Sequence, residues 1–144
     1  MKSLFIISFL FLQFFCACTN NDRQQNNTPA SENDVDAARN FIRSALDGDY
    51  KKARTFIIND SVNNEYLDVA ERNYQSRMSQ GDKRGYREAS INIHSVNPVN
   101  DSTSIIHYSN SYKKKEDSVK VLRSHGEWLV DLKYSFPSIT QATQ

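Results

Sequence analysis

The stretch that decides the fold is residues 103–136, TSIIHYSNSYKKKEDSVKVLRSHGEWLVDLKYSF. Apolar and polar side chains alternate through most of it, and this two-residue period is typical of a half-buried β-strand. Two interruptions divide it, the charged run Lys113–Asp117 and the pair His125-Gly126. Because the connections are short, consecutive strands are expected to pair antiparallel. The three strands predicted here are residues 103–112, 118–123 and 127–136.

Residues 34–78, which come before this stretch, carry apolar side chains at three- and four-residue spacing, the period of an amphipathic helix. Polar residues that favour helix N-termini divide the region, and Gly48 marks the end of one helix. The three helices expected here have their caps at Asn33 or Asp34, at Asp49 and within Asn59–Ser61. The run Ser79–Gly85 (SQGDKRG) breaks the helical pattern.

A fourth strand is predicted ahead of the other three, at residues 88–96. There Ala89, Ile91 and Ile93 alternate with polar residues, and the turn signal Asn97–Asp101 (NPVND) follows. Helices followed by a four-stranded meander indicate the α+β class, with the N-terminal helices packed on one face of an antiparallel sheet.

The first residues of the chain indicate a secretory signal peptide, residues 1–17. Lys2 supplies a positive start, and Leu4–Phe15 is an almost unbroken apolar run of twelve residues. A helix that spans a bilayer permanently needs roughly 20 residues, so this run is expected to be cleaved off. The alternative is a retained anchor or a buried core helix, but nothing downstream is apolar enough to pair with it.

Phe15-Cys16-Ala17-Cys18 resembles the lipobox of bacterial lipoproteins, in which small residues precede a cysteine that is lipidated. Ala17 is the small residue before Cys18, whereas Cys16 follows two bulky phenylalanines. Phe15 departs from the usual Leu three positions before the cysteine. The alternative for two cysteines in an exported chain is a disulfide, but this one would enclose a single residue. We therefore expect Cys18 to carry the acyl chains that hold the protein on a membrane, because two or more chains make attachment stable.

The domain boundaries follow from composition. Residues 18–33 are the lipidated cysteine and a polar tether with no large apolar residue, and residues 137–144 are a similarly polar tail. Residues 34–136 remain for one domain with one core. Thr19 follows the cysteine where enteric-type sorting places Asp in lipoproteins retained at the inner membrane. The expected location is thus the cell envelope, in the outer membrane, on its periplasmic or surface face.

Two parts of the folded region carry a family resemblance. Ala38–Ile57 (ARNFIRSALDGDYKKARTFI) ends a helix in Gly-Asp-Tyr and opens a Lys/Ala-rich second helix. The chain closes with Val119–Val121, the Gly126 turn, Trp128 and Val130-Asp131. Both parts resemble small bacterial lipoprotein domains of the cystatin-like, nuclear-transport-factor-2-like group. The resemblance implies a curved sheet wrapped around a long helix, a cone able to hold a cavity, and it carries over no catalytic residue.

Charge and motifs exclude several classes of function. The formal net charge is +1, so the basic surplus that nucleic-acid binding requires is absent from the sequence. His94, His107 and His125 lack metal-ligand spacing, and we expect no metal site and no cofactor. Lys113–Lys115 has the charge to attract phosphate or anionic headgroups, but the acids that follow it favour a solvated turn.

The cone expected from the resemblance has an interior that could serve either of two functions. A carrier of a small apolar ligand would need a cavity, which we expect to be lined by Tyr66, Tyr74, Ile91, Ile106 and Trp128. An isomerase- or hydrolase-like enzyme would need a buried acid beside a tyrosine. Asp68 and Asp131 are the acids considered, with Tyr66, Tyr74, Tyr108 and Tyr134 as tyrosines, but no spacing selects a pair.

The function that the sequence favours is binding through the outward face of the sheet. Ile105, His107 and Leu129 fall on the side of their strands away from the helices, where they can support contact. We therefore expect a non-enzymatic, lipid-anchored binding module that takes a protein partner or forms a homodimer through this face.

Overall fold

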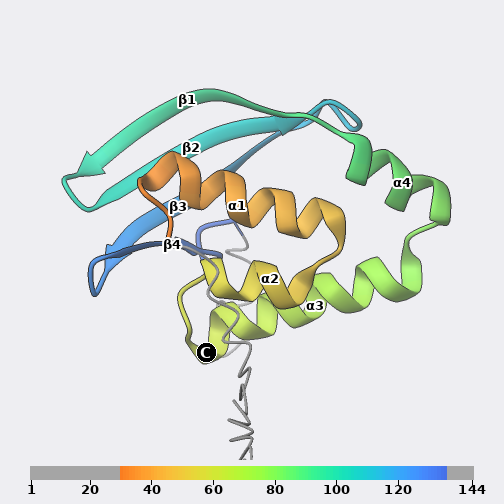
Figure 1. Cartoon of the computed structure of the whole chain (residues 1–144), viewed down its shortest axis with the longest axis horizontal. Coiled ribbons are helices and arrows are strands. Elements are labelled where there is room, and N and C mark those ends of the chain that lie inside the picture. The colour runs from red at the N-terminus through yellow and green to blue at the C-terminus, as the bar shows by residue number, and fades with distance from the viewer. Residues whose placement is uncertain (1–29, 136–144) are drawn as a thin grey trace, which may run out of the picture.

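The computed structural model describes residues 30–135, which form four α-helices, one short 3-10 helix and one four-stranded sheet (Figure 1). The helices are α1 (Asp34–Asp47), α2 (Tyr50–Ala53), the 3-10 helix η1 (Arg54–Phe56), α3 (Ser61–Arg77) and α4 (Gln80–Glu88). The strands are β1 (Ile91–Asn100), β2 (Thr103–Asn110), β3 (Glu116–Ser124) and β4 (Glu127–Asp131). All neighbouring strands pair antiparallel in the order β1-β2-β3-β4. The predicted α+β class is confirmed.

Local side-chain caps explain where the first three helices begin. The Asn33 side chain accepts a hydrogen bond from the backbone N–H of Asp36 at 2.9 Å, and Asp49 and Asp60 cap α2 and α3 in the same way. Gly48 ends α1 at φ 77°, and an added Cβ there would meet the Tyr74 ring at 2.5 Å. Only glycine meets both the backbone and the packing requirement at that position.

The helices lie on one side of a curved sheet (Figure 1). Helix α1 packs against all four strands and lies between the sheet and helices α2 and α3. Ala37, Ala38, Phe41 and Ile42 of α1 are buried in this layer. The sheet contributes its buried residues Ile106, Val119, Val121 and Val130. The core is therefore formed between α1 and one face of the sheet, and α2, η1 and α3 close it on the other side.

The predicted break after residue 78 is present, because α3 ends at Arg77, but its extent is wrong, because Gln80–Gly85 belongs to α4. Ser79 is the N-cap, and its hydroxyl accepts from the Asp82 backbone N–H at 3.1 Å. None of the residues of α4 is fully buried, so apolar burial does not explain the helix. The Arg43 guanidinium of α1 donates to the carbonyl of Ala89 at 2.7 Å and to that of Tyr86 at 3.1 Å. A long-range cation thus satisfies the carbonyls at the C-terminal end of α4.

The strand bounds also differ from the prediction. β1 continues through the expected turn Asn97–Asp101 and stays paired with β2 as far as Asn100. Pro98 is tolerated because β1 is an edge strand, and the register shifts once before this region and once within it, between Pro98 and Asn100. β4 ends at Asp131 rather than at Phe136. There the buried side chain of Asn63 accepts from the Leu132 N–H at 2.7 Å, in place of a strand partner.

Candidate functional site

The five residues expected to line a cavity are divided between the core and its margin. Tyr66, Tyr74 and Ile106 are 4%, 9% and 0% exposed and are part of the packed core. Ile91 and Trp128 are half-buried and pack against its edge. Trp128 also lines a small surface pocket of about 70 Å³. The first three residues therefore fill the interior instead of lining a chamber that a ligand can enter.

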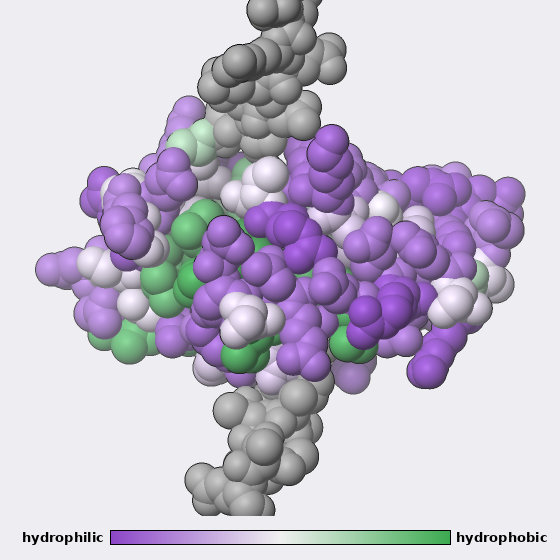
Figure 2. All heavy atoms as spheres, turned by 90° about the horizontal axis from the view of Figure 1, so that it is seen from below, coloured by the Kyte–Doolittle hydropathy of each residue, from purple (hydrophilic) through white to green (hydrophobic). Residues whose placement is uncertain are grey.

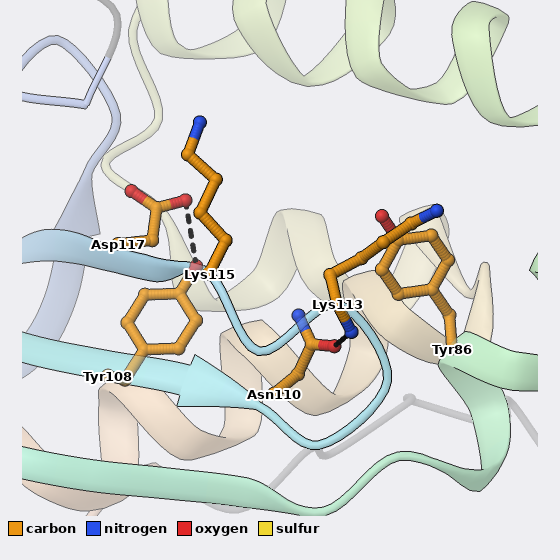
Figure 3. Close-up of a pocket in the computed structure, with 6 residues that line it drawn as sticks. All are labelled: Tyr86, Tyr108, Asn110, Lys113, Lys115 and Asp117. Atoms are coloured by element: carbon orange, nitrogen blue, oxygen red, sulfur yellow. Dashed lines mark hydrogen bonds between the residues drawn. The ribbon is translucent and has the colours of Figure 1, made fainter.

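A larger pocket lies at the end of the sheet beside α4 (Figure 3). Its volume is about 380 Å³, and six residues line it: Tyr86, Tyr108, Asn110, Lys113, Lys115 and Asp117. Tyr86 belongs to α4, and the other five come from β2, β3 and the turn between them. The antiparallel register places Tyr108 opposite Asp117. The turn that connects β2 to β3 carries the two lysines that line the pocket.

Tyr108 and Asp117 form the wall of the pocket on the sheet side. The Tyr108 hydroxyl donates to Asp117 Oδ2 across a long 3.5 Å, and the Ser118 N–H donates to Oδ1 at 2.8 Å. Burial, followed by the negative charge of Asp117, raises the pKa of the Tyr108 hydroxyl well above its ordinary value. The Tyr108 phenol therefore stays protonated at neutral pH, and it lies beside an Asp117 side chain that accepts hydrogen bonds on both oxygens.

Lys113 and Tyr86 line the opposite side of the pocket, and behind them Lys113 contacts Asp82 and Tyr112. Its Nζ lies 3.1 Å from Asp82 Oδ1 and 4.8 Å from the centre of the Tyr112 ring. The Tyr112 hydroxyl donates to the same Asp82 oxygen at 2.8 Å. Hydrogen bonds from Ser79, Tyr112 and Lys113 lower the pKa of Asp82 to about 2, and the bond to Asp82 raises the pKa of Lys113. Both charges are therefore present at neutral pH.

Lys115 differs from Lys113 in having no partner. It is exposed, and its ammonium makes no hydrogen bond or ion pair with any of residues 30–135. Figure 3 shows its side chain extending along the open side of the pocket, between Asp117 and Tyr86. The pocket thus contains one cation whose charge is matched and one whose charge is not.

The predicted outer sheet residues lie on the face that the helices leave uncovered. Ile105 and His107 alternate with the buried Ile106, and Leu129 pairs with Leu122 of β3. All four side chains have intermediate exposure. In the register Thr103, Leu122 and Leu129 lie side by side across three strands. The sheet therefore carries a short row of two leucines and one threonine, here called the apolar row, on the side away from α1.

The acids considered for an enzyme have structural partners. Asp68 accepts from Arg54 at 2.5 Å, and Asp131 lies 3.5 Å from Lys120 and 3.6 Å from Lys133. Two other acids do meet a tyrosine: Asp82 accepts from Tyr112 and, in the pocket, Asp117 accepts from Tyr108. Sequence reasoning missed the second pair, although counting outward from the Lys113–Asp117 reversal in an antiparallel hairpin brings Tyr108 opposite Asp117.

The histidines have structural surroundings too. His94 Nε2 lies 2.9 Å from the Ser109 hydroxyl, and His125 adopts φ 51° in the β3–β4 turn beside Ser124. Within residues 30–135 no three His, Cys, Asp or Glu side chains are grouped to hold a metal ion.

The expected lipidation site, Cys18, lies outside the described residues. In the part of the chain that the structure describes, no helix has the length and hydropathy to cross a membrane. Comparisons with known protein families, curated proteins and solved structures found no match to this chain. Its function must therefore be argued from the surfaces described above.

Proposed function

We propose that this chain is a lipoprotein of the cell envelope, anchored in the outer membrane by acyl chains on Cys18. Its folded part acts as a non-enzymatic binding module that takes a protein partner on the outer face of the sheet. The partner to which we commit is a second copy of the same chain.

The observation that carries the proposal is that the helices cover only one face of the sheet (Figure 1). The other face presents Ile105, Leu122 and Leu129 at intermediate exposure among polar residues. The opposite side of the molecule, that of α3, is seen in Figure 2 and is mostly hydrophilic, with a group of apolar side chains left of centre. An apolar centre with a polar rim is typical of protein interfaces.

The charges on this face suit a copy of itself. Lys120 and Glu127 both belong to the outer side of their strands, one on β3 and the other on β4. A two-fold axis brings the same patch of each copy together, so such an interface must carry both members of each charge pair. A face with a cation and an anion on either side of an apolar row meets this condition.

The size of the face indicates a weak dimer. Four strands about 4.8 Å apart and about 26 Å long present roughly 500 Å² in projection. Stable complexes bury about 800 Å² per partner, so this dimer belongs at the low end. Anchoring would confine the copies to one membrane and raise their effective concentration, which favours weak pairing.

Sedimentation equilibrium of the full chain in a non-ionic detergent tests the proposal. We expect reversible self-association in the micromolar range. Leu122→Glu should weaken it more than about tenfold, because it places a charge where the dimer would bury an apolar side chain worth ~1.5–3 kcal/mol.

Val62→Glu is the matched control, since Val62 is a 37% exposed apolar residue on α3, on the helix side of the domain. Its association constant should equal that of the unmodified chain. A chain that remains monomeric at every concentration, or an equal loss in both variants, would contradict the proposal. Circular dichroism confirms that each variant is folded.

A further inference from the structure

We propose that the pocket between α4 and the β2–β3 turn binds a small anion that carries a ring, such as an aromatic carboxylate or an aryl phosphate monoester. This site is separate from the outer sheet face, because Tyr108 shares the inner face of β2 with the buried Ile106. Its volume of about 380 Å³ falls within the range of ligand pockets, roughly 300–1,000 Å³.

The free hydrogen-bonding capacity of Lys115 favours an anion. Lys113 pairs with Asp82 at 3.1 Å, and Asp117, which has no ion pair among the described residues, already accepts hydrogen bonds on both of its oxygens. Lys115 is the charged lining group that makes no hydrogen bond to any of residues 30–135. A carboxylate or phosphate placed beside it gains a charge-assisted hydrogen bond, the stronger kind.

Asn110 adds a second donor with a fixed direction. Its Oδ1 accepts the backbone N–H of Lys113 at 2.9 Å, and this bond sets the orientation of the amide. Nδ2 is consequently on the side of the pocket, pointing into the space between Lys113 and Lys115 (Figure 3). An anion held by Lys115 lies within reach of this neutral donor.

The two tyrosines select a ring. Tyr86 and Tyr108 stand on opposite sides of the pocket, one from α4 and one from the sheet (Figure 3). Tyr86 is fixed by an edge contact with Tyr112, with ring centres 5.2 Å apart. Aromatic walls held in this way favour offset or edge contacts with a flat ligand. The ring and the anionic group would thus be recognised by different parts of one pocket.

The test measures ligand binding to the full chain in non-ionic detergent by saturation-transfer NMR. The probes are benzoate and phenyl phosphate, with benzyl alcohol as the neutral ring and inorganic phosphate as the anion without a ring. Binding of either ring-bearing anion at millimolar or lower concentration is expected, and the tighter of the two identifies the headgroup. The two control probes should bind at least about tenfold more weakly, because each lacks one of the two recognised groups.

Neighbouring lysines provide matched variants. Lys115→Gln should weaken binding of the ring-bearing anion about tenfold, as expected for loss of a hydrogen bond to a charged group. Lys114→Gln should leave it unchanged, because Lys114 is exposed and does not line the pocket. The proposal is overturned if neither anion binds, if inorganic phosphate binds as tightly as phenyl phosphate, or if both variants lose affinity equally.

Discussion

Tyr50 of α2 is the residue whose ionisation is most directly tied to the core. It is 7% exposed, and its ring lies 5.6 Å from that of Tyr74 in an edge-to-face contact. Burial, followed by the nearby Tyr74 and Glu71, raises the pKa of the Tyr50 hydroxyl from 10.0 to about 12. The packing of α2 against α3 therefore favours the protonated phenol.

This shift predicts a loss of stability in alkali. Above pH 10 the unfolded chain releases the Tyr50 proton while the folded chain keeps it up to about pH 12, so the free energy of unfolding falls across this window. Tyr50→Phe should remove this part of the fall. Urea titrations of both proteins should differ by a constant amount below pH 10 and converge or cross above it. Parallel curves over the whole range would contradict the assignment.

Only some of the residues of the pocket can be identified from the sequence alone. The lysine run was visible, and so was its position in a reversal. The interpretation as a solvated turn omitted Tyr86, which reaches the same place from α4. Because α4 itself depends on a contact with α1, no local pattern around Tyr86 indicates that it faces Lys115.

Helix α4 is held at its C-terminal end by one side chain of α1. Arg43 donates to three carbonyls near its C-terminal end and also pairs with Asp47 at 2.9 Å. Arg43→Ala removes these charge-assisted hydrogen bonds, each worth roughly 1.5–3 kcal/mol. Hydrogen exchange of the α4 amides should then accelerate at least about tenfold, while α1 stays protected.

Arg39→Ala serves as the control for this change. Arg39 is exposed on the same helix, about one turn earlier, and its replacement should leave α4 protection unaltered. If α4 exchanged at the same rate in all three proteins, another contact would have to hold the helix.

The sequence predicts the ends of elements that neighbouring residues fix. It does not predict the ends that depend on contacts with residues distant in the sequence. The caps at Asn33, Asp49 and Asp60 act within three residues, and each marks a helix start correctly. The end of β4 depends on Asn63, which is 69 residues away from Leu132 in the sequence. Pro98 favours a turn in the sequence pattern. It lies within a strand because β1 is at the edge of the sheet. Periodicity therefore predicted the class and the order of all the main elements except α4, and tertiary contacts set several of their limits.

At the scale of the whole molecule, the anchor is tested by a single substitution. Cys18→Ser removes the thiol that would be acylated, and it changes none of residues 30–135, which the structure describes. We expect the variant to move from the membrane to the soluble fraction with an unchanged circular dichroism spectrum. Cys16→Ser is the control and should stay on the membrane. Retention of the Cys18 variant in membranes washed with high salt would contradict lipidation.

Helix α1 separates two ends of the domain. Ala30 and Ser31 lie beside Trp128 and Leu129, at the end where α1 begins, whereas α4 and the β2–β3 turn lie toward the other end (Figure 1). The fourteen residues of α1 span about 21 Å. A chain tethered at Cys18 would therefore have a proximal and a distal pole. The anion pocket would be at the distal pole, where it samples solutes away from the lipid headgroups and their negative surface potential.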